Sequence, residues 1–168
     1  GDLLLLKKLL AHTKKIGAQV AFNPGGQELK HPGFRAIIAR KETQQSLGFL
    51  ILNREEACAF TAERFEDTFG LLRALSRLTP ATVMTDGPKG AYAVIRSALH
   101  NPRYMIQAYF VPSAGHKAKN QTGAGDAFGS GFVTGFIKSQ GDIKEALRVG
   151  SLNADSVVQH IGAKVGIL

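Results

Sequence analysis

Cysteine, tryptophan and long apolar runs are what this sequence most clearly lacks. Its 168 residues include one cysteine and no tryptophan. The lone Cys58 excludes an internal disulfide and a cysteine-rich zinc site and suits a reducing compartment, so we expect a cytoplasmic protein with Cys58 as a small core residue. No apolar stretch approaches the ~20 residues that span a bilayer, and Lys7 and Lys8 interrupt the opening leucines too early for a signal peptide. These absences argue against a membrane protein.

Acidic residues are scarce relative to basic ones, with 13 Asp plus Glu against 21 Lys plus Arg and a formal net charge of +8. Such a surface attracts polyanions, which include nucleic acid, acidic membranes and polyphosphate ligands, and the sign does not choose among them. Aromatic residues make up 8% of the chain and form no basic-aromatic patch, which argues against a nucleic-acid binder. The five histidines lack metal-ligand spacing.

Helical and strand-like segments alternate along the chain. We predict helices at 3–16, 32–40, 65–77, 123–139 and 143–161, a short helix after Asn53, and strands at 20–22, 47–52, 81–85, 91–96 and 104–111. The apolar run at Leu47–Leu52 is typical of a parallel strand covered on both faces, whereas 91–96 and 104–111 suggest hairpin-like pairing at one edge. With no repeat or linker in between, we expect one three-layer α/β/α domain over residues 1–168 with a mostly parallel central sheet.

A glycine-rich loop, KNQTGAGDAF at residues 119–128, leads into the helix predicted at 123–139. Where a loop becomes a helix, the first N–H groups have no partner within the helix and lie at the positive end of its dipole, so they bind anions. Gly123 and Gly125 permit close approach of a ligand, Ala124 adds little bulk, and further glycines would let the helix pack closely on a neighbour. The loop therefore predicts an anion site.

The known phosphate loops do not match this segment. A Walker A loop needs Lys and Ser or Thr after its last glycine, and the dinucleotide fingerprint needs a glycine where Phe128 stands. Asp126 is unusual because a carboxylate beside an anion site repels phosphate, so its presence there suggests a separate role. One such role is to accept a proton from an attacking hydroxyl. The alternative is that Asp126 only favours the helix dipole, as acidic residues in first turns commonly do, and these four residues alone leave both explanations open.

Gln121–Phe128, followed by a helix rich in small residues, resembles the C-terminal signature of the PfkB family of carbohydrate kinases, within the ribokinase-like fold. Three other segments resemble the family's motifs in the family's order. Asn53–Glu56 resembles its N-x-x-E motif, Thr85–Gly90 its nucleotide-binding T-x-G-x-x-G turn, and Asn153–Leu168 its closing helix and terminus. The resemblance covers most of this chain but only the C-terminal half of the family.

This resemblance implies an ATP-dependent phosphotransferase that acts on a hydroxyl of a sugar or nucleoside. Asp126 would be the catalytic base, and the amides of Gly123, Ala124 and Gly125 would form the anion hole. Phosphoryl transfer needs positioning and charge neutralisation more than covalent chemistry, so backbone amides, one metal and one base suffice. The basic surface would help to attract ATP.

The other motifs imply the nucleotide and metal contacts. Asn53 and Glu56 would organise Mg²⁺ and the phosphates, with Glu56 reaching the metal through water, although an ordinary helix start also explains this pair. The residues that would bind the nucleotide are Asn53, Glu56, Thr85, Gly87 and Gly90, with Asn153 near the base.

Two departures from the family's pattern limit the analogy. Asn120 stands where the family usually has an Asp that helps to hold a monovalent cation, which argues against potassium dependence. The family's N-terminal half, which normally supplies sugar-contacting strands and a lid, has no counterpart here. We therefore expect a sheet that is incomplete on its N-terminal side, and either a missing N-terminal half or a homo-oligomer. The alternative function is a truncated or degenerate kinase half that binds nucleotide or a partner chain without catalysis.

Overall fold

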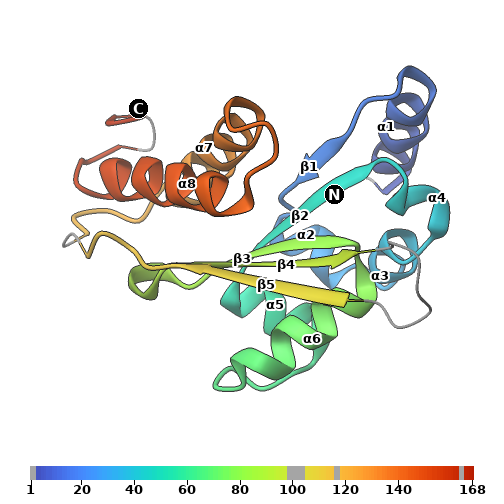
Figure 1. Ribbon diagram of the computed structural model, residues 1–168. Helices are drawn as coiled ribbons and strands as arrows, with labels where there is room; N and C mark the ends of the chain where they lie inside the picture. The colour runs from blue at the N-terminus through green and yellow to red at the C-terminus, as the bar shows by residue number, and fades with distance from the viewer. Residues whose placement is uncertain (1–2, 98–104, 116–117, 163–164) are drawn as a thin grey trace. The chain divides into compact units, whose positions relative to one another are not determined.

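The computed structural model describes residues 3–97, 105–115, 118–162 and 165–168 (Figure 1). The elements in this part of the chain are α1 (Leu3–Ile16), β1 (Val20–Phe22), α2 (Gly26–Lys30), α3 (Phe34–Ile38), α4 (Lys41–Gln44), β2 (Leu47–Asn53), α5 (Arg54–Thr61), α6 (Thr68–Leu78), β3 (Ala81–Thr85), a 3₁₀ turn (Gly87–Lys89), β4 (Ala91–Ser97), β5 (Met105–Val111), α7 (Ala124–Lys138) and α8 (Ile143–Val158). The predicted alternation of helices and strands is confirmed.

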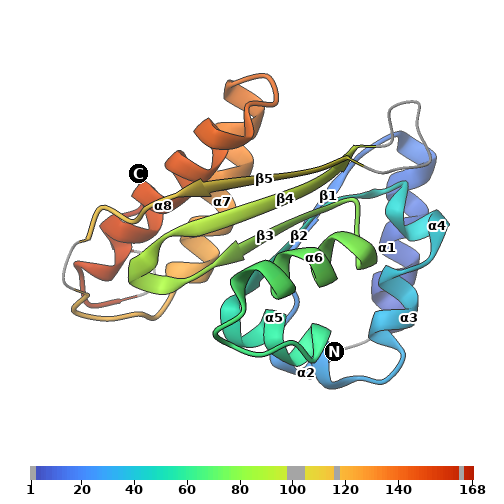
Figure 2. The ribbon, with the colours of Figure 1, turned by 60° about the horizontal axis from the view of Figure 1, so that its bottom comes forward.

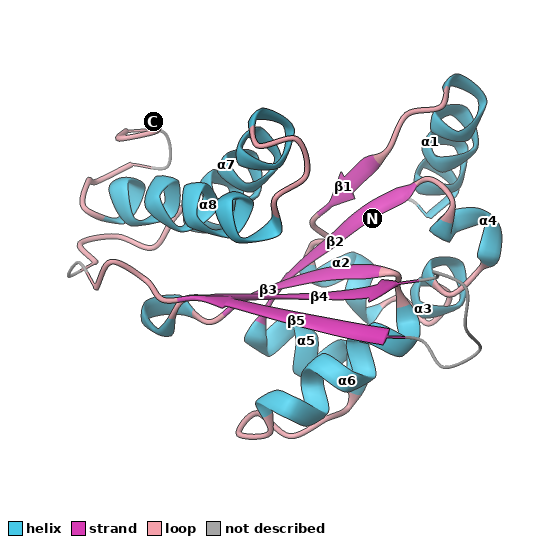
Figure 3. Ribbon diagram, viewed as in Figure 1, coloured by secondary structure: helices cyan, strands magenta, loops and turns pink. Residues whose placement is uncertain are grey.

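The described strands form one five-stranded sheet in the order β1-β2-β3-β4-β5 (Figure 3). Strand β1 pairs with β2 in parallel, with Val20 opposite Leu47 and Phe22 opposite Leu50. The connections from β3 to β4 and from β4 to β5 are too short for a parallel crossover, which takes a dozen residues or more, so these neighbours run antiparallel. The sheet is therefore mixed and open, and the predicted α/β class is confirmed.

The chain divides into two compact units. One comprises Gly1–Val83 with Val94–Ala108, and the other Met84–Ala93 with Tyr109–Leu168. Strands β3, β4 and β5 pass from one unit into the other, so each unit holds part of the sheet. The single domain over residues 1–168 stays a prediction.

The core of the first unit lies between the sheet and helices α5 and α6, which sit side by side on one sheet face (Figure 2). Phe34 and Phe60 are buried there with ring centroids 5.6 Å apart. Helix α6 begins three residues later than predicted because Asp67 is its N-cap, with Oδ1 accepting from the Gly70 amide at 2.7 Å. Cys58, expected in the core, is only partly buried on α5, and burial is the main factor that raises the pKa of its thiol.

Helices α7 and α8 pack side by side in the second unit (Figure 1). Glycines make this close approach possible. A Cβ at Gly131 would lie 3.0 Å from the Val149 carbonyl oxygen, and one at Gly135 would lie 3.0 Å from the Ala146 Cα. The predicted tight packing of the glycine-rich helix is confirmed at these two positions, while α8 ends at Val158, earlier than the predicted 161.

Candidate active site

The loop before α7 presents main-chain donors at the start of the helix. Gly123 is the N-cap with φ +85°, in the left-handed region that favours glycine, and no side chain caps the helix. The amides of Gly123, Gly125 and Asp126 have no acceptor within the described residues. The Ala124 amide differs, because it donates to the Gln121 carbonyl oxygen at 3.2 Å. The donors open to a ligand are therefore the amides of Gly123, Gly125 and Asp126. The anion hole itself stays a prediction.

Asp126 lies in the first turn of α7 and its side chain is exposed. Among the described residues, its carboxylate has no hydrogen-bond or ion-pair partner. It forms no capping box, because the N-cap is a glycine without a side-chain bond. Its contribution to the helix is thus limited to the dipole. The carboxylate is open to solvent, so a substrate hydroxyl can reach it. Its role as the base stays a prediction.

The turn Thr85–Gly90 joins β3 to β4 and is built on two glycines of positive φ. The Asp86 amide donates to the Gly90 carbonyl oxygen at 2.8 Å, which closes the turn. Gly87 has φ +52° and open space where a Cβ would stand. Gly90 has φ +122°, and its Cβ would overlap the Val111 carbonyl oxygen and lie 2.8 Å from the Cα of Pro112. The turn therefore lies directly against the end of β5.

Asn53 and Glu56 form a capping box at the start of α5, as the alternative explanation of this pair expects. Asn53 Oδ1 accepts from the Glu56 amide at 2.8 Å, and Glu56 Oε2 accepts from the Asn53 amide at 2.8 Å. Burial is the main cause that raises the pKa of Glu56, opposed by the bond from Asn53 and assisted by the charge of Glu55. Within the described residues the second carboxylate oxygen, Oε1, has no protein partner.

Asn153 is buried on α8, and its side chain ties three segments together. Nδ2 donates to the Ala127 carbonyl oxygen at 2.7 Å and contacts Ser130 Oγ at 3.3 Å, while Oδ1 accepts from the Leu168 amide at 2.8 Å. These bonds use both ends of the side-chain amide, so Asn153 has a structural role in this state, and its predicted place near the nucleotide base stays a prediction.

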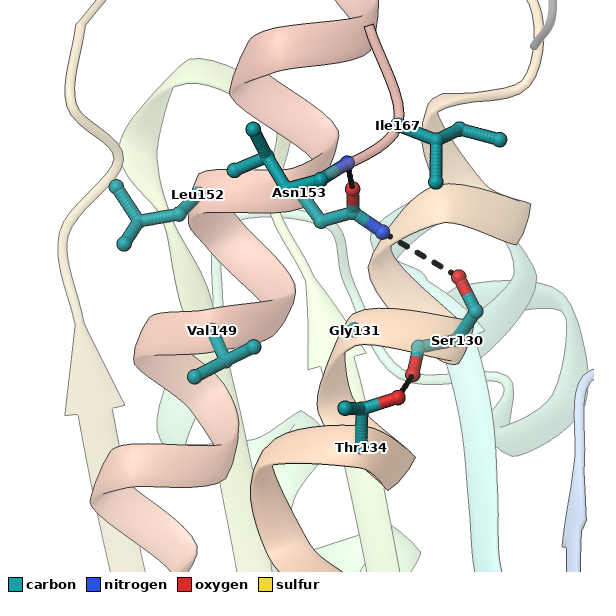
Figure 4. Close-up of a pocket in the computed structure, with 8 residues that line it drawn as sticks. Ser130, Gly131, Thr134, Val149, Leu152, Asn153 and Ile167 are labelled. Carbon is teal, nitrogen blue, oxygen red and sulfur yellow. Dashed lines mark hydrogen bonds between the residues drawn. The ribbon is translucent and has the colours of Figure 1, made fainter. Parts of the chain in front are cut away.

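Asn153 also lines a pocket of about 260 Å³ between α7, α8 and the C-terminal residues (Figure 4). The other lining residues are Ser130, Gly131, Thr134, Val149, Leu152, Ile167 and Leu168. Most of this lining is apolar, and Figure 4 shows Asn153 reaching across to Ser130 on α7. The α7 residues that line the pocket come after the glycine-rich helix start, in the same unit.

The predicted site residues fall in both units. Asn53 and Glu56 belong to the first, and the other positions, namely Thr85, Gly87, Gly90, Gly123, Ala124, Gly125, Asp126 and Asn153, belong to the second. In the described residues no group of three or more His, Cys, Asp or Glu side chains could hold a metal ion. A single carboxylate is nevertheless enough for Mg²⁺, which keeps several waters. Asn120, the departure from the family's Asp, accepts from the Thr122 amide through Oδ1 at 2.9 Å.

The profile of the pfkB family carbohydrate kinases matches residues 9–167, which is almost the whole chain. The chain belongs to the pfkB family. A curated relative, an uncharacterized sugar kinase of Archaeoglobus fulgidus, is 41% identical over 51 residues, which are 30% of this chain and 20% of the relative.

Solved structures place this pfkB chain in the ribokinase-like fold. The adenosine kinase of Sinorhizobium meliloti superposes with a TM-score of 0.77 and 20% identity. This match covers 96% of the present chain and 46% of the adenosine kinase chain. A fructokinase of Vibrio cholerae, bound to fructose, ADP and calcium, has a TM-score of 0.70 and 21% identity, covering 94% of this chain and 50% of its own. The chain thus spans about half the length of the solved structures that it matches, and identities this low establish the fold alone. None of the helices in the described ranges has the length and apolar character needed to cross a membrane.

Proposed function

We propose that this pfkB chain carries the nucleotide and phosphoryl-transfer site of an ATP-dependent kinase whose acceptor is a hydroxyl of a sugar or nucleoside. The observation that supports this most is the start of α7, where free amides of Gly123, Gly125 and Asp126 and the exposed carboxylate of Asp126 occur within one helical turn. The family's profile and the fructokinase with fructose and ADP agree with this class of reaction.

The chain's residues have separate tasks in this proposal. The free amides bind the oxygens of the phosphoryl group and stabilise the charge that develops during transfer. Asp126 accepts the proton of the attacking hydroxyl, for which its exposed carboxylate has no competing partner in the described residues. The turn Thr85–Gly90 supplies main-chain contacts to the nucleotide, because glycines permit close approach of a ligand.

Magnesium fits the residues that are present. Glu56 Oε1 has no protein partner in the described part of the chain, and Asn53 lies beside it at the same helix start. Mg²⁺ commonly binds through one or two carboxylates with several waters, so Glu56 would hold it through water. When bound, the ion neutralises phosphate charge. The raised pKa of Glu56 makes this binding compete with a proton, so it weakens as the pH falls.

The substitution Asp126→Asn tests the base. We expect transfer from labelled ATP to a panel of sugars and nucleosides to fall by about 10²- to 10⁴-fold, the usual contribution of a general base, with ATP affinity within about twofold of wild type. The matched control is Glu42→Gln, an exposed acidic residue in the first turn of α4, which should change neither value. Undiminished transfer by the Asp126→Asn variant would exclude Asp126 as the base.

The second candidate function is a kinase half that binds nucleotide, or a partner chain, without catalysis. The observation that favours it is that this chain spans about half the length of the solved structures. It predicts ATP binding by calorimetry without product for any acceptor in the panel. A chain that binds no ATP would contradict both the kinase proposal and a nucleotide-binding half.

A further inference from the structure

The chain between β5 and α7 is tied to α8 by a carboxylate that no predicted motif assigns a role. Asp155 is half-buried on α8. Its Oδ1 accepts from Ser113 Oγ at 3.0 Å, and its Oδ2 accepts from the Ala114 amide at 2.8 Å. Ser113 Oγ in turn accepts from the Gly115 amide at 3.2 Å. Hydrogen bonds to an ionised carboxylate are stronger than neutral ones, so this residue fixes the chain just after β5.

A second attachment lies one helical turn further along α8. The Val158 carbonyl oxygen accepts from the amides of Lys119 and Asn120, at 2.7 and 3.2 Å. Val158 is the last residue of α8, where carbonyl oxygens lack a partner within the helix. Asn120 then accepts from the Thr122 amide, directly before Gly123. Consecutive hydrogen bonds therefore lead from α8 to the start of α7.

The same segment also touches the glycine turn. The nearest atoms to a Cβ built on Gly90 are the Val111 carbonyl oxygen, the Pro112 Cα at 2.8 Å and the Ser113 amide nitrogen at 2.9 Å. The backbone that Asp155 fixes is thus the backbone on which the Thr85–Gly90 turn rests. All of these residues belong to the second unit.

We infer that Asp155 is a positioning residue, which sets the anion-binding amides at the start of α7 relative to the Thr85–Gly90 turn. It acts through Ser113 and Ala114, and Val158 provides the second attachment. This inference rests on the proposed function, because it assigns Asp155 to the accuracy with which the phosphates are bound. Asp155 itself makes no contact with the nucleotide or the acceptor.

Two measurements on the full chain test the inference, with Asp155→Ala as the main variant. In the free protein, we expect hydrogen exchange to become at least tenfold faster at the hydrogen-bonded amides of this segment, which are those of Ala114, Gly115, Lys119, Asn120, Thr122 and Ala124. Exchange in the middle of α7 and α8 should stay as in wild type. The dissociation constant of ATP with Mg²⁺ should rise at least fivefold, and that of adenosine, which lacks phosphates, should change by less than twofold.

Two milder variants and one control accompany it. Ser113→Ala, which removes one of the two bonds, and Asp155→Asn, which keeps one side-chain oxygen, should both weaken ATP by an intermediate factor. These two decide the question if Asp155→Ala does not fold. Glu145→Gln is the control, because Glu145 lies on the same helix and pairs with Arg148 at the surface. It should bind ATP as wild type does.

The outcomes separate this inference from the proposed function. ATP affinities within twofold of wild type in all three variants would overturn the positioning role, and so would an equal loss for ATP and adenosine, which indicates general damage. If the wild-type chain binds no ATP, the proposed function fails, and the exchange rates of the hydrogen-bonded amides of Lys119, Asn120, Thr122 and Ala124 alone decide whether Asp155 fixes the loop.

Discussion

Gly125→Ala is expected to stabilise the fold and weaken nucleotide binding at the same time. Gly125 is the second residue of α7, is exposed and has φ outside the left-handed region, and a Cβ built on it meets nothing within 4 Å. Replacing glycine by alanine in a helix gains about 0.5–1 kcal/mol, because alanine loses less conformational freedom on folding. Near a helix end we expect the lower value, so the free energy of unfolding in urea should rise by about 0.5 kcal/mol.

The effect on binding has the opposite sign. If the free amides of Gly123, Gly125 and Asp126 bind phosphate, a methyl group on Gly125 lies among them and keeps the phosphate at a distance. We expect the dissociation constant of ATP with Mg²⁺, measured by calorimetry, to rise at least tenfold, which corresponds to about 1.4 kcal/mol. Fold stability alone gives no reason for a glycine at this position, which agrees with the proposed approach of a phosphate.

Gly131→Ala is the matched control in the same helix. Its Cβ would lie 2.9 Å from the Asn153 Cβ and 3.0 Å from the Val149 carbonyl oxygen, so α7 and α8 must move apart. We expect a loss of about 2 kcal/mol in unfolding free energy, within the range for overpacked sites. A Gly125→Ala variant that gains stability and keeps its ATP affinity would show that these amides do not face a phosphate. One that loses stability would refute the reasoning about open space.

Two further predictions concern the turn and the capping box. Gly90→Ala should lower the unfolding free energy in urea by about 3 kcal/mol, because φ is +122° and the added Cβ meets backbone atoms. Gly87→Ala should lower it by only about 1 kcal/mol, because φ is +52° but the space around the added Cβ is open. Equal losses in the two variants would contradict the argument from close contact. The pKa of Glu56 is raised above 4.5 in the fold, so its contribution to stability is present below pH 4.5 and is lost as the pH rises through the folded-state pKa. Glu56→Gln can keep both capping bonds and does not titrate. As the pH rises from 4.5 through the folded-state pKa, its free energy of unfolding should therefore increase relative to that of the wild type. A difference in unfolding free energy that does not depend on pH would contradict the raised pKa.

The sequence predicted most elements that have strong local signals. The bounds of β1 and β3 were correct, as were those of α1, whose end at Gly17 has the positive φ of a glycine cap. The short helices α2 and α4 were missed, because four or five residues carry too little periodicity to separate them from turns. The predicted strand residue Tyr104 lies outside the described residues.

The glycines of the candidate site were predictable from the sequence, whereas the side chains that hold them in place were not. The sequence identified Gly123 and Gly90 as site residues, and both have a positive φ, which favours glycine. Asp155 lies 42 residues along the chain from Ser113, and nothing in the local pattern of either residue indicates that pairing. Similarly, the local pattern around Asn153 did not indicate that its side-chain amide bonds to α7 and to the Leu168 amide, and its place near a nucleotide base stays a prediction.

The glycines of the site could be predicted and the residues that hold them in place could not, because most of the proposed site consists of main chain. The amides at the start of α7 and the Thr85–Gly90 turn act through backbone atoms, so their signature in a sequence is a pattern of glycines that permit the conformation. A glycine-rich backbone gains close approach to a ligand but has no side chains to fix itself. Its position must then come from neighbours, and in the second unit those neighbours are the Asp155 carboxylate and the Val158 carbonyl oxygen of α8. Accuracy of phosphate binding should therefore depend on α8, a helix that need not touch the phosphate.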